Sequence, residues 1–520
     1  MTPFDSAGAF RSIDARDHLR RIAVRSAAFT VVGQSLGFVI QMTATVVLAR
    51  LLTPSDFGLV VMVTTFSLLL VNFGLNGITE AILQREDMNH ALASNLFWIN
   101  TGCGVLLTLA FVSGAPLLAR FYGDPRIASV AVVVALTILL TSVSVVHLAL
   151  LKRAMQFAAV SINDIVARAF SVGTSILLAV LGWGYWALVA GVIALPLSTC
   201  LGAWMLCRWL PGLPRRNTHT VPMIRFAMHT YGRFVASYLT WNLDNFLVGW
   251  RFGAAPLGYY KKAYDLFILP VNQLSSPLTG VAVSTLSRLT GDIAQYRRYY
   301  LNAVTPLAFV GMGVGACLTL VGADVIVLLL GPRWEESGRI FTFFGPGIGI
   351  MLVYYTSGWI HLSIGRADRG FRWGLVEIAV TTLAFVVALP WGPVGIAIAW
   401  VTSLWILTVP GLWYAGRPID LGVAPLIRGV GKYVAASTIA AVICAAMMRI
   451  TPGAFVALTA TERVVRILSI SATFGALYVS TVVVLHRGLA PIRQILALVG
   501  DMIPSRRQAG GPERPVLSAH

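Results

Sequence analysis

About fourteen stretches of apolar sequence follow one another between Ser26 and Leu485, and each is long enough to cross a lipid bilayer. A transmembrane helix needs roughly 20 mainly apolar residues. Inside lipid every backbone amide must be paired within the protein, so only helical bundles and closed barrels are stable there. Long apolar runs, rather than short alternating strands, predict an all-α integral membrane protein. Because 57% of the chain is hydrophobic and 12% is charged, no soluble catalytic domain remains, which excludes most enzymes.

Short loops, most of them with charges, proline or glycine, separate the predicted transmembrane helices. These helices cover residues 26–49, 57–79, 95–119, 128–150, 164–182, 185–207, 229–252, 262–286, 301–322, 338–364, 373–391, 393–415, 433–450 and 464–486. The longest internal connector, 208–228, is basic and proline-broken and follows the sixth helix. We interpret it as the boundary between two halves of the molecule.

A weak internal repeat supports this boundary. Segment 49–59 (ARLLTPSDFGL) and segment 249–259 (GWRFGAAPLGY) each join two helices. Each starts its second helix at a hydrophobic-Gly pair, Phe57-Gly58 and Leu257-Gly258, offset by 200 residues. Transporters often consist of such repeats, with the substrate path between them. The predicted organisation is therefore an amphipathic cytoplasmic N-tail, an N-lobe of helices 1–6, a cytoplasmic connector, a C-lobe of helices 7–12 around a shared central cavity, two further helices and a cytoplasmic C-tail. These parts cover residues 1–25, 26–207, 208–228, 229–415, 416–486 and 487–520.

The net charge of +18 is explained by membrane topology rather than by nucleic-acid binding. Lys and Arg concentrate in cytoplasmic loops of membrane proteins. Most of the 39 basic residues fall in loops on one side when the N-terminus is placed inside. Both termini are therefore expected in the cytoplasm of a multi-pass bacterial inner-membrane protein. The five cysteines have none of the spacings of metal ligands, so we expect no metal or other cofactor.

The seventh predicted helix, 229–252, carries unusual charges. Arg233 and Arg251 are five helical turns apart and share one face, and Asp244 lies about 20° from that line. An intramembrane acid either pairs with a base to fix packing or marks a substrate or ion path. We expect this face to line a path, while pairing of Asp244 and placement of the arginines at the interfaces remain the structural alternative.

Further candidates lie on the same helix and on three others. Tyr238 and Trp241 suit a sugar face or ordinary core packing, and Lys261 with Lys262 suits a phosphate or an interfacial anchor. Interhelical hydrogen bonding also explains each remaining amide. These amides, which with the preceding residues would line a cavity between two halves, are Gln34 and Gln41 in the first predicted helix, Asn72 in the second, and Asn272 and Gln273 in the eighth.

Several motifs occur in the order typical of the polysaccharide transporter family, which the chain resembles from about residue 20 to 415. They are ARLLTPSDFG (49–58), ILQRED (82–87), FWIN (97–100), RFYGDP (120–125), NLDNFLVG (242–249), LLLGPRW (328–334), GRADR (365–369) and LPWGPVGIAIAW (389–400). The family contains the Wzx-like lipid-linked oligosaccharide flippases of the multidrug/oligosaccharidyl-lipid/polysaccharide exporter superfamily. The resemblance implies alternating-access transport of an undecaprenyl-pyrophosphate-linked repeat unit for exopolysaccharide or O-antigen export. The implied partners are this lipid-linked glycan, membrane lipid, a coupling proton or cation, and the polymerase or export machinery.

Two other functions stay open from the sequence. A cation-coupled antiporter of small molecules or drugs would have the same fold, but it would need an acid at mid-membrane in the N-lobe, where Glu80 and Asp164 lie at helix ends. A membrane glycan polymerase or ligase would need a large outward loop, and the predicted outward loops are short. We therefore expect a transporter rather than an enzyme.

Overall fold

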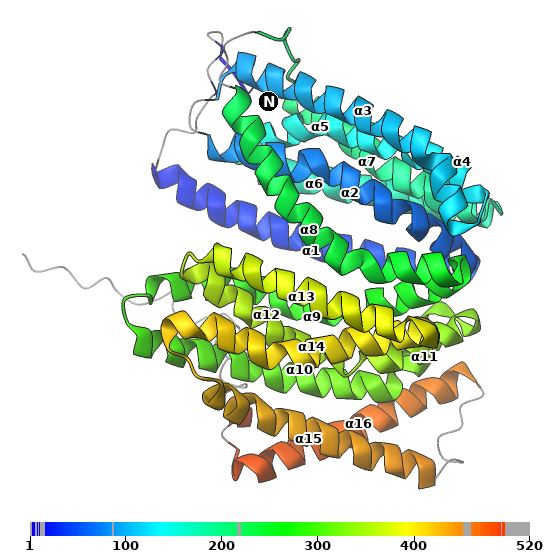
Figure 1. Ribbon diagram of the computed structural model, residues 1–520, viewed down its shortest axis with the longest axis vertical. Coiled ribbons are helices and arrows are strands. Elements are labelled where there is room, and N and C mark those ends of the chain that lie inside the picture. Colours follow the sequence, from blue (N-terminus) through cyan, green and yellow to red (C-terminus); the bar gives the residue numbers. More distant parts are fainter. Residues whose placement is uncertain are drawn as a thin grey trace, which may run out of the picture. The chain divides into compact units, whose positions relative to one another are not determined.

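The computed structural model describes residues 3–5, 8, 10, 16–85, 88–215, 220–450, 459–489 and 491–493. In this part of the chain all regular secondary structure is helical, apart from isolated bridge residues at Phe4, Phe10 and Asn89. The α-helices, labelled in Figure 1, are α1 (Arg16–Leu51), α2 (Pro54–Gln84), α3 (His90–Tyr122), α4 (Arg126–Val134), α5 (Leu136–Arg153), α6 (Phe157–Val180), α7 (Tyr185–Cys207), α8 (Thr220–Phe252), α9 (Ala254–Arg288), α10 (Ile293–Leu330), α11 (Glu335–Phe344), α12 (Gly347–Ser363), α13 (Ala367–Ala388), α14 (Gly392–Gly416), α15 (Val423–Ile450) and α16 (Ala460–His486). Three 3₁₀ turns are η1 (Pro332–Trp334), η2 (Leu389–Trp391) and η3 (Arg417–Ile419).

Local sequence signals account for several helix ends. α2 begins with a capping box, in which the Thr53 hydroxyl accepts from the Asp56 amide and the Asp56 carboxylate accepts from the Thr53 amide. Pro54 occupies the first turn, where the missing N–H costs nothing. Thr459 and Glu462 start α16 in the same way. These pairs satisfy backbone donors that lipid could not satisfy.

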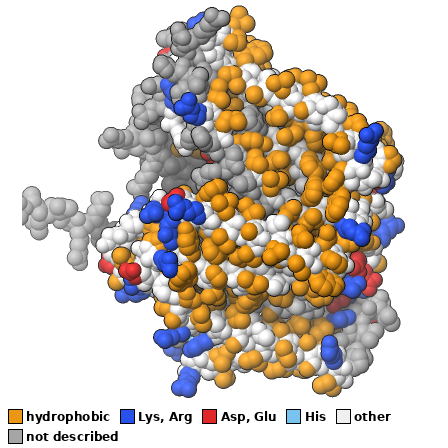
Figure 2. Space-filling model, viewed as in Figure 1, with side chains coloured by type: hydrophobic (Ala, Val, Ile, Leu, Met, Phe, Trp, Pro, Cys, Tyr) orange, Lys and Arg blue, Asp and Glu red, His pale blue; other side chains and the backbone are white. Residues whose placement is uncertain are grey.

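The all-α membrane fold is confirmed, whereas the number of spans is not. Among the described residues, 11 helices are long and apolar enough to cross a membrane, or 12 if the bent pair Pro332–Phe344 and Gly347–Ser363 is one span. The predicted count of 14 differs for two reasons: α8 is not in this set, and Ala367–Ile419 counts once although η2 divides it into α13 and α14. Hydrophobic side chains cover most of the described surface in view, and Lys and Arg lie mainly toward its left and right sides (Figure 2).

Several predicted boundaries differ from the helices of the structure. The predicted span 128–150 is divided into α4 and α5 at Ala135, and α15 begins at Val423 rather than at residue 433. The single span 338–364 is interrupted, because α11 ends at Phe344 and α12 begins at Gly347 after Gly345 and Pro346; proline cannot donate a helical hydrogen bond. α1 is continuous from Arg16, where we expected a surface helix to give way to a span near residue 25. α8 begins at Thr220, so part of the predicted connector is helical. The predicted C-tail, 487–520, lies mostly outside the described residues.

The chain divides into two compact units, which we describe separately. The first contains Met1–Phe267, Ala323–Phe344 and Gly374–Ser403, and the second contains the rest. In the first unit α1 packs on α6, α6 on α7, and α2 on both α5 and α8. The lobe boundaries predicted from the sequence stay a prediction, because the two units divide within α9, α10, α13 and α14.

The connector after α7 is bound along one face of α3. Ser94 Oγ accepts from the Gly212 amide (2.9 Å), and Trp98 Nε1 donates to Gly212 O (2.9 Å). The Asn95 amide pairs with both backbone groups of Arg215, at 2.7 and 2.8 Å. Gly212 packs closely on α3, since a Cβ there would lie 3.0 Å from the His90 ring. The start of the connector is thus held as a strap on the N-terminal end of α3.

In the second unit, small residues allow close helix packing. A Cβ on Gly349 of α12 would lie 2.8 Å from the Met312 backbone of α10, so the two backbones touch. α15 packs on α16, and the Tyr478 hydroxyl of α16 donates to Phe309 O of α10 (2.8 Å). Small residues at helix interfaces are typical of membrane proteins, where close van der Waals packing replaces the hydrophobic effect as the driving force.

Candidate functional site

The two repeated segments identified in the sequence lie against each other. A Cβ on Gly58, in the first turns of α2, would lie 1.7 Å from Ala254 O, and a Cβ on Gly258, in the first turns of α9, would lie 1.9 Å from Pro54 O. Residue 58 thus meets 254 while residue 258 meets 54, each offset by 200. This reciprocity is the signature of a two-fold contact between equivalent patches. The crossing has no room for a side chain on either helix.

The C-terminal end of α1 contacts the end of α10 and the 3₁₀ turn η1 beside this crossing. Arg50 Nη2 donates to Leu328 O (2.8 Å) and Arg50 Nε to Leu329 O (3.0 Å), which places a cation on the last carbonyls of α10. Trp334 Nε1 in η1 donates to Ala49 O (2.8 Å), and Trp334 is fully buried. We call these contacts, together with the Gly58–Gly258 crossing, the clasp. It joins the start of the predicted N-lobe to the middle of the predicted C-lobe.

Aromatic rings and a lysine fill the space beside the clasp. Phe57 packs edge-on against Trp334 at 5.3 Å between ring centroids. Lys262 Nζ lies 4.1 Å from the centroid of Phe57, and Lys262 is 9% exposed. A cation over a ring face is stabilised by the ring quadrupole, more strongly when water is excluded. Lys262 is therefore held by an aromatic ring, whereas its neighbour Lys261 forms an ion pair with Asp265 (2.5 Å).

Asp244 is fully buried between α8 and α9. The Tyr260 hydroxyl donates to Asp244 Oδ2 (2.8 Å), and the Asn245 amide donates to Oδ1 (2.8 Å). Tyr260 is also fully buried. None of the ion pairs found among the described residues includes Asp244. The Tyr260 hydroxyl and the Asn245 amide thus bind the two oxygens of this carboxylate.

The other candidates on α8 differ in their surroundings. Tyr238 donates its hydroxyl to Thr65 O of α2 (2.8 Å), so it ties α8 to the N-terminal half. Trp241 is 55% exposed, and Arg251 is exposed with its guanidinium 5.7 Å from the Phe252 centroid. The side chain of Arg233 lies outside the described residues. Among these candidates, the described part of α8 therefore presents a buried acid, a hydrogen-bonded tyrosine and two exposed side chains, and that they line a path stays a prediction.

The predicted amides lie on three helices, and their grouping around one cavity stays a prediction. Gln34 and Gln41 are exposed on α1. Asn72 donates to Leu68 O of its own helix (2.7 Å). Asn272 and Gln273 are exposed on α9 and belong to the second unit. Within the described residues no group of three His, Cys, Asp or Glu side chains could hold a metal ion.

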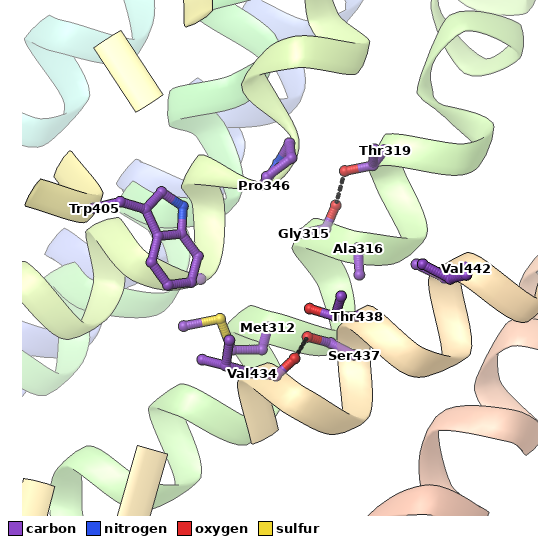
Figure 3. Close-up of a pocket in the computed structure, with 12 residues that line it drawn as sticks. Met312, Gly315, Ala316, Thr319, Pro346, Trp405, Val434, Ser437, Thr438 and Val442 are labelled. Carbon is purple, nitrogen blue, oxygen red and sulfur yellow. Dashed lines mark hydrogen bonds between the residues drawn. The ribbon is translucent and has the colours of Figure 1, made fainter. Parts of the chain in front are cut away.

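The second unit contains a cavity of about 260 Å³ that the sequence did not indicate. Figure 3 shows the Thr319 hydroxyl directed to Gly315 O and the Ser437 hydroxyl to Val434 O, so both bond within their own helices. The cavity therefore presents mainly apolar atoms, and none of the predicted site residues lines it. Its lining residues are Met312, Gly315, Ala316, Thr319, Pro346, Gly349, Trp405, Val434, Ser437, Thr438, Ala441 and Val442.

Sequence reasoning also missed the clasp, although a signal was present. Arg50 belongs to ARLLTPSDFG and Trp334 to LLLGPRW, two of the motifs that carry the family resemblance. Each motif alone predicts a helix end followed by a turn. Their contact depends on helix packing between segments 285 residues apart.

Comparisons with known proteins agree with this architecture. A family model described as "Polysaccharide biosynthesis protein" matches residues 47–339. The succinoglycan biosynthesis transport protein ExoT of Rhizobium meliloti is 22% identical over 497 residues, covering 95% of this chain and 99% of that protein. The lipid II flippase MurJ in an inward closed conformation has a TM-score of 0.70 at 13% identity, covering 89% of this chain and 99% of that one. An inward-facing MATE transporter of the MOP superfamily has a TM-score of 0.60 at 14% identity, covering 75% and 98%.

Proposed function

The chain belongs to the polysaccharide biosynthesis protein family, and from this premise we propose that it flips lipid-linked oligosaccharides across the bacterial inner membrane. The resemblance to polysaccharide transporters is confirmed by this match and by the similarity to a succinoglycan transport protein along nearly the whole chain. The similarity to lipid II flippase and MATE structures confirms the exporter fold. The proposed cargo is an undecaprenyl-pyrophosphate-linked repeat unit for exopolysaccharide or O-antigen assembly. The proposed activity is transport, without a chemical step.

The main energetic cost of such transport is moving the polar glycan through the hydrocarbon core of the membrane. Its hydroxyl groups would lose their hydrogen bonds to water in the hydrocarbon core, at several kcal/mol for each unpaired group. A polar path that opens to one side at a time removes this cost, while the lipid tail stays in the bilayer. The pyrophosphate would be attracted by basic side chains such as Arg233, Arg251 and Lys261, and the sugars by Trp241 and the amide groups.

The observation that carries the mechanism is the reciprocal crossing of Gly58 and Gly258. Two halves that touch through equivalent backbone positions, with no intervening side chain, can close a path at that level and reopen it only by moving apart. In the topology predicted from the positive charges, both termini are cytoplasmic and residues 50–56 face the periplasm. The clasp would then be the periplasmic gate, closed in this structure, and its separation would release the glycan outward.

Asp244 is our candidate for coupling transport to a proton or cation. An acid buried within a membrane helix marks a substrate or ion pathway, or it stabilises packing. Its bond to Tyr260 links α8 to α9, which begins at the crossing. A change in the charge of Asp244 would therefore act on the helix that forms half of the clasp. The polymerase and export machinery remain proposed partners on the periplasmic side.

The proposal is tested by deleting the gene and measuring lipid-linked oligosaccharides in inverted and right-side-out membrane vesicles. We expect one oligosaccharide to accumulate on the cytoplasmic leaflet, and the wild-type gene to restore its appearance on the periplasmic leaflet. Deletion without such accumulation, while another small molecule or drug is retained in the cells, would favour the antiporter instead. A lengthened or unpolymerised glycan that accumulates outside would favour a polymerase.

A further inference from the structure

A cluster of basic and aromatic side chains in the second unit is not used by the proposed transport path. His361 lies in the last turn of α12, Arg369 and Trp373 in the first turns of α13, and Tyr414 near the end of α14. A Cβ on Gly370 would lie 3.5 Å from His361 Cδ2, so the first turn of α13 lies directly against the imidazole. We call His361, Arg369 and Tyr414 the headgroup cluster.

Aromatic contacts fix the geometry of this cluster. The Arg369 guanidinium lies 4.3 Å from the Tyr414 centroid, and Arg369 Nη2 donates to Tyr414 O (2.6 Å). Trp373 stacks on the same tyrosine at 5.6 Å and donates Nε1 to the Tyr354 hydroxyl (2.8 Å). The His361 ring lies 6.0 Å from Tyr414. The Arg369 guanidinium and the His361 imidazole therefore both pack against the Tyr414 ring.

Polar atoms in this cluster lack partners. His361 is 6% exposed, and within the described part of the chain neither of its ring nitrogens has a hydrogen-bond partner. The Nε of Arg369 is buried and also lacks one there. Buried polar atoms in native proteins are nearly always paired with protein, water or an ion. Three unpaired nitrogens on two neighbouring side chains therefore indicate a bound group that carries several hydrogen-bonding oxygens.

The surrounding charge indicates the sign of that group. Arg366 and Arg372 are exposed on the same segment, and Asp368 forms an ion pair with Arg366 at 3.2 Å. The segment is thus net positive, and Arg369 itself would repel a cation. The predicted topology places this turn at the cytoplasmic surface, where basic pockets between transmembrane helices bind lipid headgroups. Trp and Tyr are also enriched at that depth.

We propose that the headgroup cluster binds the phosphate of a lipid headgroup in the cytoplasmic leaflet. A phosphate group offers enough acceptor oxygens for Arg369 Nε and for one donating nitrogen of His361, and its charge complements the guanidinium. The other His361 nitrogen accepts from a headgroup hydroxyl or a protonated phosphate oxygen. The lipid is a phospholipid or the carrier's own pyrophosphate, since both present the same chemistry. A phospholipid at this site does not depend on the proposed transport activity, because a lipid can anchor α12–α14 in a protein of any function, whereas the carrier's pyrophosphate rests on the proposed function.

The test measures the melting temperature of the purified full-length protein in a phosphate-free detergent. We expect phosphatidylglycerol to raise Tm saturably, and diacylglycerol, which lacks phosphate, to leave it unchanged. Undecaprenyl pyrophosphate and inorganic phosphate are added in separate experiments. A shift with the prenyl pyrophosphate alone assigns the site to the carrier lipid, and an equal shift with inorganic phosphate shows that the phosphate suffices without a lipid and overturns the lipid assignment.

Two variants and a control make the test specific. Arg369→Gln should raise the half-saturating lipid concentration at least about tenfold, as expected for loss of a charged hydrogen bond. His361→Phe should abolish the lipid-dependent shift and raise the Tm of the lipid-free protein, because the unpaired nitrogens are removed. Arg417→Gln is the matched control, since Arg417 stacks on the adjacent Trp413 at 3.9 Å. The proposal is wrong if no phosphate compound shifts the wild-type Tm, or if both variants respond as the wild type does; in either case water fills the site.

Discussion

Substituting Gly258 by alanine tests whether the crossing of α2 and α9 is a closed gate. The new Cβ would lie 1.9 Å from Pro54 O. Carbon–oxygen contacts are normally about 3.3 Å or longer, so the two helices must move apart by ~1.4 Å. The obstacle is the backbone of α2 rather than the end of a flexible side chain, so it cannot rotate out of the way. Gly58→Ala meets the same obstacle from the other side, with its Cβ 1.7 Å from Ala254 O.

The size of the effect follows from the packing. Inserting a methyl group into a close-packed contact typically costs about 1–3 kcal/mol. If the contact exists only in the closed state, the variant lowers the ratio of closed to open molecules by about 5- to 150-fold. Since either alanine already separates the helices, the double variant should cost less than the sum of the two single variants.

The assay is thiol labelling in intact cells. The five native cysteines, which are free, are first replaced, and Leu59, which is fully buried next to Gly58, is changed to cysteine. We expect a membrane-impermeant maleimide to label this position faster when Gly258→Ala is present. Gly114→Ala is the control, because its Cβ would meet nothing within 4 Å. Unchanged labelling and unchanged glycan export in Gly258→Ala, with normal amounts of protein in the membrane, would refute the gate.

Three further predictions concern other contacts. Asp244→Asn keeps a partner for Tyr260 but removes the charge, so we expect export to fail while membrane insertion is normal; unimpaired export would make Asp244 a packing residue. Arg50→Gln loses charged bonds to two carbonyls of α10, which are worth about 1.5–3 kcal/mol each, and we expect a lower Tm in detergent, whereas an unchanged Tm would argue against the clasp. Asn95→Ala releases the backbone of Arg215, and limited proteolysis should then cut the connector faster than in the wild type; equal rates would mean that the strap is held elsewhere.

The sequence predicted the fold class and the family because both depend on composition and short motifs. Apolar runs of bilayer length leave helices as the only solution. The number of spans was less predictable. Two spans were predicted where Ala367–Ile419 counts once, with η2 carrying the chain from α13 to α14. One span was predicted where Gly345 and Pro346 separate α11 from α12. Proline and glycine indicate a possible break, but packing decides whether the chain bends or continues.

The candidate site was predicted in part. Asp244 stood out by its charge, and its burial is confirmed by the structure, but Tyr260 as its partner could not be read from a spacing of sixteen residues. Gln34, Gln41, Asn272 and Gln273 are exposed, and their place along a substrate path stays a prediction, because exposure alone does not tell a cavity-facing from a lipid-facing amide.

The sequence by itself determined that this chain is a helical membrane protein of a polysaccharide transporter family, and its 200-residue repeat indicated two related halves. Only the tertiary structure decided that the repeated segments touch, that Gly58 and Gly258 leave no room for a side chain, and that Arg50 and Trp334 join helices far apart in the chain. Hydropathy and motifs are local properties, whereas backbone contact between two helices depends on how every intervening helix packs.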